Sequence, residues 1–327
     1  MKISVQTPCR LHFGLIDLNG ELGRINGGLG VALQKPFWKI IGSDDTKQNH
    51  SKLDDKIFLA IKKFDEYFQT DTKEFSIQIK EEIPKHVGLG SNTQFLLAIG
   101  KILSKLHRIN PTIQEIARAV QRGGTSGIGV AAFEKGGIIL DGGHSFGPGK
   151  QTDSFLPSSI SKAPPPPVIF QYYPPKDWYF LLLIPTINLG SHGDEEVKLF
   201  YEKCPIPASN IEKLSRLILM KILPAVVEND IKEFGLGLTE MQTKFERFGM
   251  ERYEVGLSNE ILMELRKHPK VFGSGISSFG PTIFTLTNTV QNAQIILKEI
   301  KENFSENKFS LLDYSSISRN GAIIKSL

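Results

Sequence analysis

The apolar positions of the first third of the chain follow two periods, one typical of strands and one typical of helices. Residues 2–41 carry alternating and continuous apolar runs that predict strands, with a long turn at residues 19–30. Residues 54–68 place apolar side chains at helical spacing and predict an amphipathic helix. The alternation in residues 75–80 predicts a half-buried strand, and the apolar run 95–103 predicts a buried helix.

The same periods continue as far as a proline-rich segment. Thr112 and Glu115 form a capping box that predicts the start of another helix. Residues 126–133 predict a short helix and residues 138–141 a strand. Four consecutive prolines occupy residues 164–167, and such a run is stiff and extended. We therefore expect a domain boundary there, which gives the domains 1–167 and 168–327.

Beyond the prolines, strands and helices alternate irregularly. Strands are predicted at 178–184 and 283–286, and helices at 209–224, 231–245, 259–266 and 292–302, with Ser209 and Ser258 as caps. Because no regular strand–helix–strand order appears, the pattern favours an α+β fold over a doubly wound sheet.

Composition and charge limit the classes of function. The chain has 327 residues with 40% hydrophobic and 23% charged side chains, which is typical of a globular protein. Its net charge of +4 is too small to indicate nucleic-acid binding and suits a small anionic substrate. Two unpaired cysteines, Cys9 and Cys204, favour a reducing, cytoplasmic setting. We expect no signal peptide and no membrane span, since no apolar run is long enough.

The segment Gly88-Leu89-Gly90-Ser91-Asn92-Thr93-Gln94 is the main candidate for chemistry. A glycine turn that leads into a helix leaves backbone N–H groups free, and these groups favour a bound phosphate. Ser91 and Gln94 also fit a capping box, so a purely structural role is the alternative. The segment fits neither the dinucleotide nor the Walker pattern.

Three glycine-rich segments, at residues 20–30, 88–91 and 273–280, resemble in spacing and order those of the GHMP kinase superfamily. A closer resemblance, to the β-ribofuranosylaminobenzene 5′-phosphate synthase family within that superfamily, covers nearly the whole chain. It is carried by Arg10 to Gly20 with Gly23-Arg24 and Gly27-Gly28, by Gly90 to Gln94, by Arg122 to Gly129, by Phe133 to Gly137, by Asp141 to His144 and by Gly273 to Thr282.

The resemblance implies a two-domain GHMP-kinase-like fold, with a ribosomal-protein-like N-terminal domain and a ferredoxin-like C-terminal domain. It also implies a decarboxylating ribosyltransferase that condenses phosphoribosyl pyrophosphate with 4-hydroxybenzoate or 4-aminobenzoate, with Mg²⁺, as a homodimer, in methanopterin-type cofactor synthesis. Asn92-Thr93-Gln94 replaces the Ser-Ala of the kinases. An ATP-dependent small-molecule kinase is the alternative, and a ligand sensor without turnover is a third.

Asp17 and Arg24 are the catalytic candidates. A carboxylate at Asp17 would stabilise an oxocarbenium-like ribose, and Arg24 would hold the benzoate carboxylate or a phosphate. Asp17 also suits the cap of a turn at Asn19-Gly20, and Arg24 a surface charge.

The implied substrate-binding residues include Arg10, which also suits a strand flank, His12, which also suits a structural hydrogen bond, and Ser126, which also suits a helix cap. The full set is Arg10, His12, Gly88, Gly90, Ser91, Asn92, Thr93, Gln94, Arg122, Thr125, Ser126, Gly273, Gly275, Ser277 and Ser278. Asp141 is a candidate Mg²⁺ ligand. We interpret His192, Asp194, Glu195 and Glu196 as the acidic first turn of a helix and not as a metal site.

Overall fold

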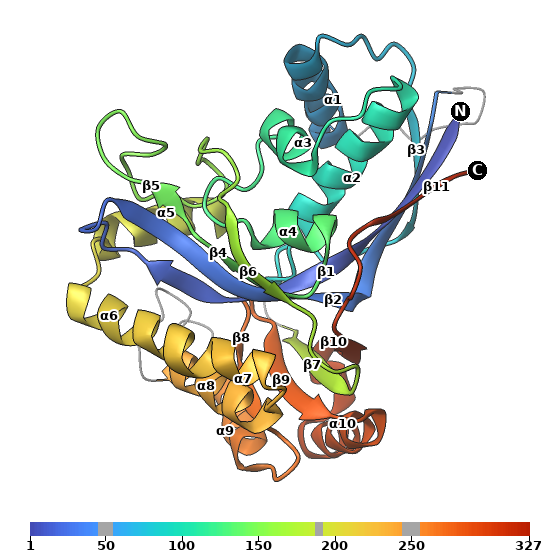
Figure 1. The fold of residues 1–327 in the computed structure, drawn as a ribbon. Coiled ribbons are helices and arrows are strands. Elements are labelled where there is room, and N and C mark those ends of the chain that lie inside the picture. Colours follow the sequence, from blue (N-terminus) through green and yellow to red (C-terminus); the bar gives the residue numbers. More distant parts are fainter. Residues whose placement is uncertain (45–54, 187–191, 244–255) are drawn as a thin grey trace.

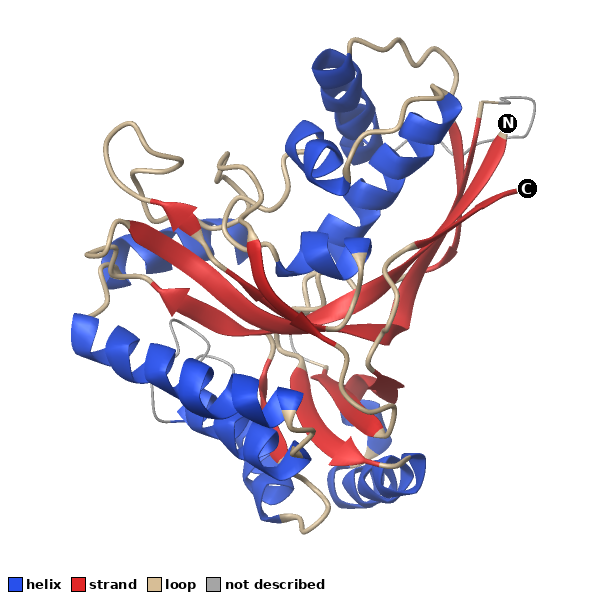
Figure 2. Ribbon diagram, viewed as in Figure 1, coloured by secondary structure: helices blue, strands red, loops and turns tan. Residues whose placement is uncertain are grey.

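A computed structural model describes residues 1–44, 55–186, 192–243 and 256–327. Two long strands cross the middle of the molecule, with one group of helices on one side and a second, smaller sheet with further helices on the other (Figures 1 and 2). The chain termini lie close together at one end, because the last strand pairs with the first.

The larger sheet has seven strands and is built around the first two. Its order is β11-β1-β2-β4-β6, and β3 and β5 also pair with β2. The pairs given by its register are all antiparallel. The strands are β1 (Lys2–Asp17), β2 (Arg24–Ser43), β3 (Ser76–Glu81), β4 (Ile138–Asp141), β5 (His144–Ser145), β6 (Val168–Tyr172) and β11 (Ile323–Ser326).

Helices from the first half of the chain lie above this sheet (Figure 1). They are α1 (Asp55–Phe68), α2 (Ser91–Leu106), α3 (Ile113–Ala119) and α4 (Ile128–Glu134). The predicted helices and the capping box at Thr112 and Glu115 are confirmed; position 54 lies outside the described residues. The central helix, α2, buries a continuous run of apolar side chains.

The smaller sheet has the order β10-β7-β9-β8 and is also antiparallel. Its strands are β7 (Trp178–Pro185), β8 (Gly273–Ile276), β9 (Ile283–Asn288) and β10 (Phe309–Ser316). The helices of this half are α5 (His192–Lys203), α6 (Ala208–Leu217), a π-helical turn η1 (Ile218–Ile222), α7 (Leu223–Val227), α8 (Ile231–Thr243), α9 (Leu257–Lys267), α10 (Val290–Phe304) and a 3₁₀ turn η3 (Glu306–Lys308).

Two predicted caps in this half are wrong. Pro207 precedes α6 and Gly256 precedes α9, so Ser209 and Ser258 lie inside the first turns, and neither helix has a side-chain cap. Serine is common at both places, so the pattern alone does not fix the first residue of a helix. The predicted helix 231–245 is confirmed as far as Thr243, and its last two positions lie outside the described residues.

The boundary that we placed after residue 167 does not separate the two sheets. Both β6 and β11 follow that residue and join the larger sheet. The two sheets also share one hydrophobic core. In it, the ring of Phe13 from β1 lies 6.0 Å from Phe180 and 5.1 Å from Phe284 in the smaller sheet. The domain limits 1–167 and 168–327 stay predictions.

Candidate active site

The segment between β3 and α2 is a tight turn that requires glycine at two positions. Gly88 and Gly90 have φ angles of 88° and 76°, in the left-handed region that favours glycine. A Cβ at Gly88 would also lie 2.2 Å from the carbonyl oxygen of Ser277. The turn is therefore packed directly against the late glycine-rich segment.

The capping box predicted for Ser91 and Gln94 is wrong, although both side chains make other structural hydrogen bonds. Gly90 is the N-cap, and no side chain caps the helix. The Ser91 hydroxyl donates instead to the carbonyl of Ile83 (2.8 Å), and the Gln94 amide donates to the carbonyl of Gly129 (2.7 Å). The first backbone N–H groups of a helix have no partner within it. Those of α2 are thus suited to binding an anion, helped by the helix dipole.

Two partly buried arginines lie beside this helix start. Arg10, on β1, donates to the carbonyl of Gly88 (2.5 Å). Burial, together with the charge of Arg122, lowers the pKa of Arg10 to about 10, so it stays charged at neutral pH. Arg122 donates twice to the hydroxyl of Thr93 (3.1 and 3.0 Å) and once to the carbonyl of Ser158 (3.3 Å). Two neighbouring guanidinium groups favour a bound ligand with more than one negative charge.

The late glycine-rich segment is a strand followed by a turn and not a single loop. Gly273 and Gly275 lie in β8, and a Cβ on Gly275 would meet Gln242 of α8 at 2.5 Å. Both glycines therefore serve helix packing and do not line the pocket. The turn begins at Ser277, and the backbone N–H of Ser278 donates to the carbonyl of His12 (2.9 Å).

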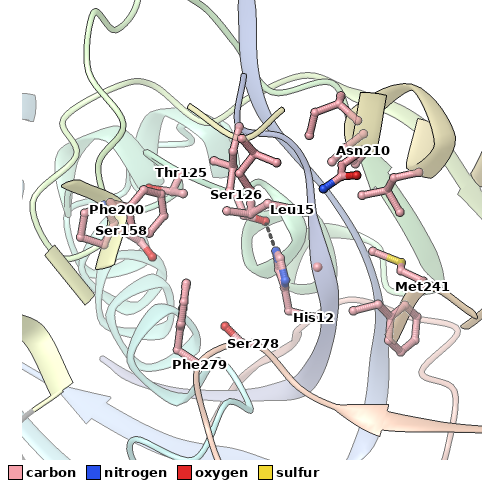
Figure 3. Close-up of a pocket in the computed structure, with 18 of the residues that line it drawn as sticks. His12, Leu15, Thr125, Ser126, Ser158, Phe200, Asn210, Met241, Ser278 and Phe279 are labelled. Atoms are coloured by element: carbon pink, nitrogen blue, oxygen red, sulfur yellow. Dashed lines mark hydrogen bonds between the residues drawn. The ribbon is translucent and has the colours of Figure 1, made fainter. Parts of the chain in front are cut away.

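A pocket opens between β1, the α3–α4 connection, α6 and this turn (Figure 3). It encloses about 910 Å³, open solvent included. Its polar end contains the predicted residues Arg10, His12, Thr125, Ser126 and Ser278. Most of the other walls are apolar, formed by Phe13, Leu15, Ile16, Leu18, Phe200, Ile206, Ile211, Leu214, Met241 and Phe279. The arrangement suits an anionic molecule with a flat apolar body.

A buried chain of hydrogen bonds runs from the pocket into the sheet. Nε2 of His12 lies 3.1 Å from the hydroxyl of Ser126, which lies 3.2 Å from Oδ2 of Asp141. Asp141 also accepts from the N–H groups of Gly127 (2.9 Å) and Gly143 (3.0 Å). Burial raises the pKa of Asp141 to about 6, against these hydrogen bonds. Burial, reinforced by Arg10, lowers the pKa of His12 to about 3.

The two residues predicted as catalytic, Asp17 and Arg24, lie at the base of the β1–β2 turn, and neither lines the pocket. Oδ1 of Asp17 accepts from the N–H groups of Asn19 (2.8 Å) and Gly20 (3.0 Å). These contacts cap the turn, as expected for the structural role that was the alternative to catalysis. Arg24 is exposed and donates to the carbonyls of Gly142 (2.9 Å) and Gly143 (2.8 Å). Their catalytic roles stay predictions.

The remaining predicted residues lie around α2. Thr125 donates to the carbonyl of Leu156 (2.7 Å). Asn92 has a buried side-chain oxygen that finds no hydrogen-bond partner among the residues that the structure describes. It lines a second hollow of about 950 Å³, together with Arg122 and the lysines Lys56, Lys63 and Lys162. The positive charges at α2 thus extend into this second hollow, which shares no lining residue with the main pocket.

The site offers a divalent cation few protein ligands. No group of three or more His, Cys, Asp or Glu side chains in the described residues is placed to hold a metal ion. Asp141, the candidate ligand, gives both carboxylate oxygens to internal hydrogen bonds and does not line the pocket. The requirement for Mg²⁺ stays a prediction.

Sequence reasoning missed the contribution of α5 and α6. Glu196 lines a small hollow with Gly88 and Ser278, and its charge acts on Arg122. Phe200 and Asn210 line the main pocket. Glu196 belongs to the acidic stretch that we interpreted as a helix start, and no motif surrounds the other two. Only the tertiary packing brings them to the site; the side chains of His192 and Asp194 lie outside the described residues.

The fold is that of the GHMP kinase structural class. The family model "GHMP kinases N terminal domain" matches residues 55–137. The homoserine kinase structure from Cytophaga hutchinsonii superposes with a TM-score of 0.67 at 15% identity, over 99% of this chain and 97% of that chain. A mevalonate diphosphate decarboxylase structure from Enterococcus faecalis gives 0.65 at 12%, over 100% and 99%. These likenesses confirm the predicted two-domain α+β GHMP-type fold.

The chain belongs, within that class, to the family of beta-ribofuranosylphenol 5′-phosphate synthases. The protein of that name from Methanocaldococcus jannaschii is 41% identical over 86% of this chain and 88% of its own length. The one from Archaeoglobus fulgidus is 37% identical over 98% of both chains. The resemblance inferred from the motifs is therefore confirmed.

Proposed function

We propose that this protein is a pentosyltransferase that condenses phosphoribosyl pyrophosphate with a 4-substituted benzoate, giving a C-riboside 5′-phosphate, CO₂ and pyrophosphate. The observation that carries the proposal is the uncapped start of α2, flanked by Arg10 and Arg122 and opening beside an apolar pocket. Such a site accommodates a polyanionic donor and an aromatic acceptor side by side. The names of the relatives support the same reaction.

The donor phosphates suit the α2 side of the site. Backbone N–H groups after Gly90 and the guanidinium of Arg122 provide donors for phosphate oxygens. The lysines beyond Asn92 add positive charge on the same side. Positive charge and N–H groups around a leaving pyrophosphate stabilise the negative charge that develops on it.

The acceptor suits the apolar side of the pocket. As the C1–oxygen bond of the ribose breaks, its electron pair leaves with pyrophosphate, and the ring carbon that bears the carboxylate forms the new bond to C1. The bond between ring and carboxylate then breaks, its electron pair restores aromaticity, and CO₂ departs. Apolar walls that hold the ring flat and exclude water favour this order over hydrolysis of the donor.

A hydroxyl is the more suitable 4-substituent. The curated relatives carry the word phenol in their names. We therefore propose 4-hydroxybenzoate as the preferred acceptor and 4-aminobenzoate as the weaker one. We also propose that Mg²⁺ arrives with the donor pyrophosphate and neutralises part of its charge.

The ATP-dependent kinase alternative has the fold in its favour and nothing further, because the likeness to the solved homoserine kinases lies at 14–15% identity. No helix in the described part of the chain is long and apolar enough to cross a membrane. A cytoplasmic location, a homodimer, a place in methanopterin-type synthesis and the absence of a nucleic-acid partner stay predictions.

Incubation with phosphoribosyl pyrophosphate, Mg²⁺ and carboxyl-labelled 4-hydroxybenzoate or 4-aminobenzoate tests the proposal. We expect labelled CO₂ and one pyrophosphate for each CO₂. ADP formation from ATP with a sugar or mevalonate-like alcohol, without CO₂ release from either benzoate, would establish the kinase instead. Binding of the donor without any turnover would indicate a sensor.

A further inference from the structure

The side chain of His12, which lines the pocket, has one ring nitrogen that no described residue contacts by a hydrogen bond. His12 lies on β1 with 6% of its surface exposed, and its ring stands in the middle of the pocket walls, between Phe279 and Asn210 (Figure 3). Its Nε2 lies 3.1 Å from the hydroxyl of Ser126. The described part of the chain offers no partner for the other ring nitrogen, Nδ1.

The protons of this hydrogen-bond chain can be assigned by counting donors. Asp141 is mainly ionised at pH 7–8 and therefore only accepts, so the single hydroxyl proton of Ser126 goes to Asp141. The oxygen of Ser126 is then an acceptor, which also takes the N–H of Ile128 (3.3 Å). Nε2 of His12 must consequently carry a proton.

The imidazole has only that one proton at neutral pH. Burial and the nearby charge of Arg10 keep the ring in its neutral form. A neutral imidazole with a proton on Nε2 has a lone pair on Nδ1. His12 is therefore held as a hydrogen-bond acceptor within a pocket whose other polar groups include cationic donors.

We propose that Nδ1 of His12 accepts a hydrogen bond from the 4-substituent of the benzoate, and that Ser126 and Asp141 hold the imidazole in the tautomer that does so. This inference rests on the proposed function and names the substrate class more closely. The acceptor must carry an O–H or N–H group opposite its carboxylate. A benzoate with an ether or a methyl group there lacks the donor and is disfavoured.

The spacing along β1 supports this orientation. Arg10 and His12 pair with Ala32 and Gly30 in an unbroken stretch of the β1–β2 register, so they lie on the same face. Two residues along a strand span about 6.6 Å, which is comparable with the distance from the carboxylate to the 4-substituent of a benzoate. The cationic side chain of Arg10 suits the carboxylate at one end of this molecule. The neutral, accepting ring of His12 suits the O–H or N–H group at the other end.

The hydrogen bond to Nδ1 also favours formation of the bond between ring and ribose, and no net proton transfer is needed. When the 4-hydroxyl donates to Nδ1, electron density on its oxygen rises, and this density is delivered to the ring carbon opposite it, where the bond to ribose forms. The proton stays shared between oxygen and Nδ1 and remains on the product phenol. His12 is thus a substrate-binding residue, and Ser126 and Asp141 are positioning residues.

A matched pair of variants at one position tests the proposal. His12→Asn places an amide oxygen near the position of Nδ1, whereas His12→Gln places its amide near Nε2 and leaves the Nδ1 position empty. Dissociation constants of 4-hydroxybenzoate and 4-methoxybenzoate are measured by calorimetry on the whole protein, in parallel with labelled CO₂ release. We expect the wild type and His12→Asn to prefer the hydroxyl compound about tenfold, and His12→Gln to show almost no preference.

Preference unchanged in His12→Gln, or lost equally in both variants, would overturn the proposal. A second measurement does not depend on a substitution: long-range ¹⁵N–¹H spectra of the wild type should show His12 protonated at Nε2, and a proton at Nδ1 would also overturn it. The proposed function fails separately, through absence of CO₂ release by the wild type.

Discussion

The hydroxyl of Ser277 and the guanidinium of Arg10 donate to the same acceptor, the carbonyl oxygen of Gly88, at 2.7 and 2.5 Å. Ser277 also accepts the backbone N–H of His12 (3.0 Å). Thr282 donates to the neighbouring carbonyl of Val87. A turn from the end of the chain thereby fixes the glycine turn against β1, on which the pocket depends.

Substitution Ser277→Ala tests this link. Loss of the hydroxyl leaves the buried N–H of His12 without its acceptor, so we expect the free energy of unfolding to fall by about 1–3 kcal/mol. Urea unfolding measures the change. Ser278→Ala is the matched control, because that hydroxyl has no hydrogen bond in the described part of the chain. Equal stability of both variants would contradict the bridging role.

A methyl group at position 28 should disturb the hydrogen-bond chain without disturbing the backbone. A Cβ on Gly28 would lie 3.0 Å from Nε2 of His12, 3.0 Å from the Ser126 hydroxyl and 3.1 Å from Oδ2 of Asp141. We expect Gly28→Ala to lower kcat/KM by at least about tenfold, since the added methyl group displaces pocket side chains, and a misplacement of about 1 Å can cost about a hundredfold in rate.

The control for this variant is Gly142→Ala, whose added Cβ would meet the exposed side chain of Ile169 at 3.0 Å. Steady-state CO₂ release compares the two proteins. If Gly28→Ala retains the activity of the control, the chain from His12 to Asp141 is not needed for turnover.

Arg122 should act on the donor and not on the acceptor. Arg122→Lys removes the paired contact with Thr93 but retains a positive charge. We expect KM for phosphoribosyl pyrophosphate to rise about 10–100-fold, while KM for the benzoate changes little. Arg118→Lys, at an exposed position of α3, is the control. A larger effect on the benzoate would place the acceptor on the α2 side.

The roles predicted for Asp17 and Arg24 can be separated from their structural contacts. Asn at position 17 keeps an oxygen for the N–H groups of Asn19 and Gly20 but loses the negative charge. We expect Asp17→Asn and Arg24→Ala to lower kcat at least tenfold, because their charges would act on the reacting groups. Asp17→Asn should leave Tm unchanged, whereas Arg24→Ala also loses the hydrogen bonds to Gly142 and Gly143, so its kcat is compared at a temperature where the variant stays folded. Wild-type turnover in both variants would leave them as turn residues only.

Sequence patterns predicted β1, β3, β4, β7, β9, the helices of the first half and the glycine turn before α2, because each depends on local spacing. The predicted turn at 19–30 was too long, since β2 already begins at Arg24, and β5, β6, β8, β10 and β11 were not predicted. The identity of the family also followed from motifs that lie in register. The N-cap positions of α2, α6 and α9 did not follow, since a serine near a helix start has other partners, as Ser91 has in Ile83. The pocket walls on α5 and α6 did not follow either, because only tertiary packing brings Phe200 and Asn210 to the pocket that Arg10 also lines.

The neutral state of His12 should appear in the pH dependence of stability. Its pKa in the folded protein is about 3, below the value of 6.5 for a free histidine. Above pH 6.5 both states carry a neutral imidazole. As the pH falls from 6.5 towards 3, the unfolded chain binds a proton that the folded chain does not, so stability is lost by about 1.4 kcal/mol per pH unit.

The raised pKa of Asp141 has the opposite effect on stability: between about pH 6 and pH 3.8 the folded protein binds a proton that the unfolded chain does not. This contribution cancels when two proteins that both contain Asp141 are compared. Urea unfolding of the wild type and His12→Asn at pH 7.5 and pH 5 should therefore show the wild type losing about 2 kcal/mol relative to the variant. A difference that stays constant between these two pH values would mean that His12 binds a proton as readily in the folded protein as in the unfolded chain, and that its ring is charged at pH 5.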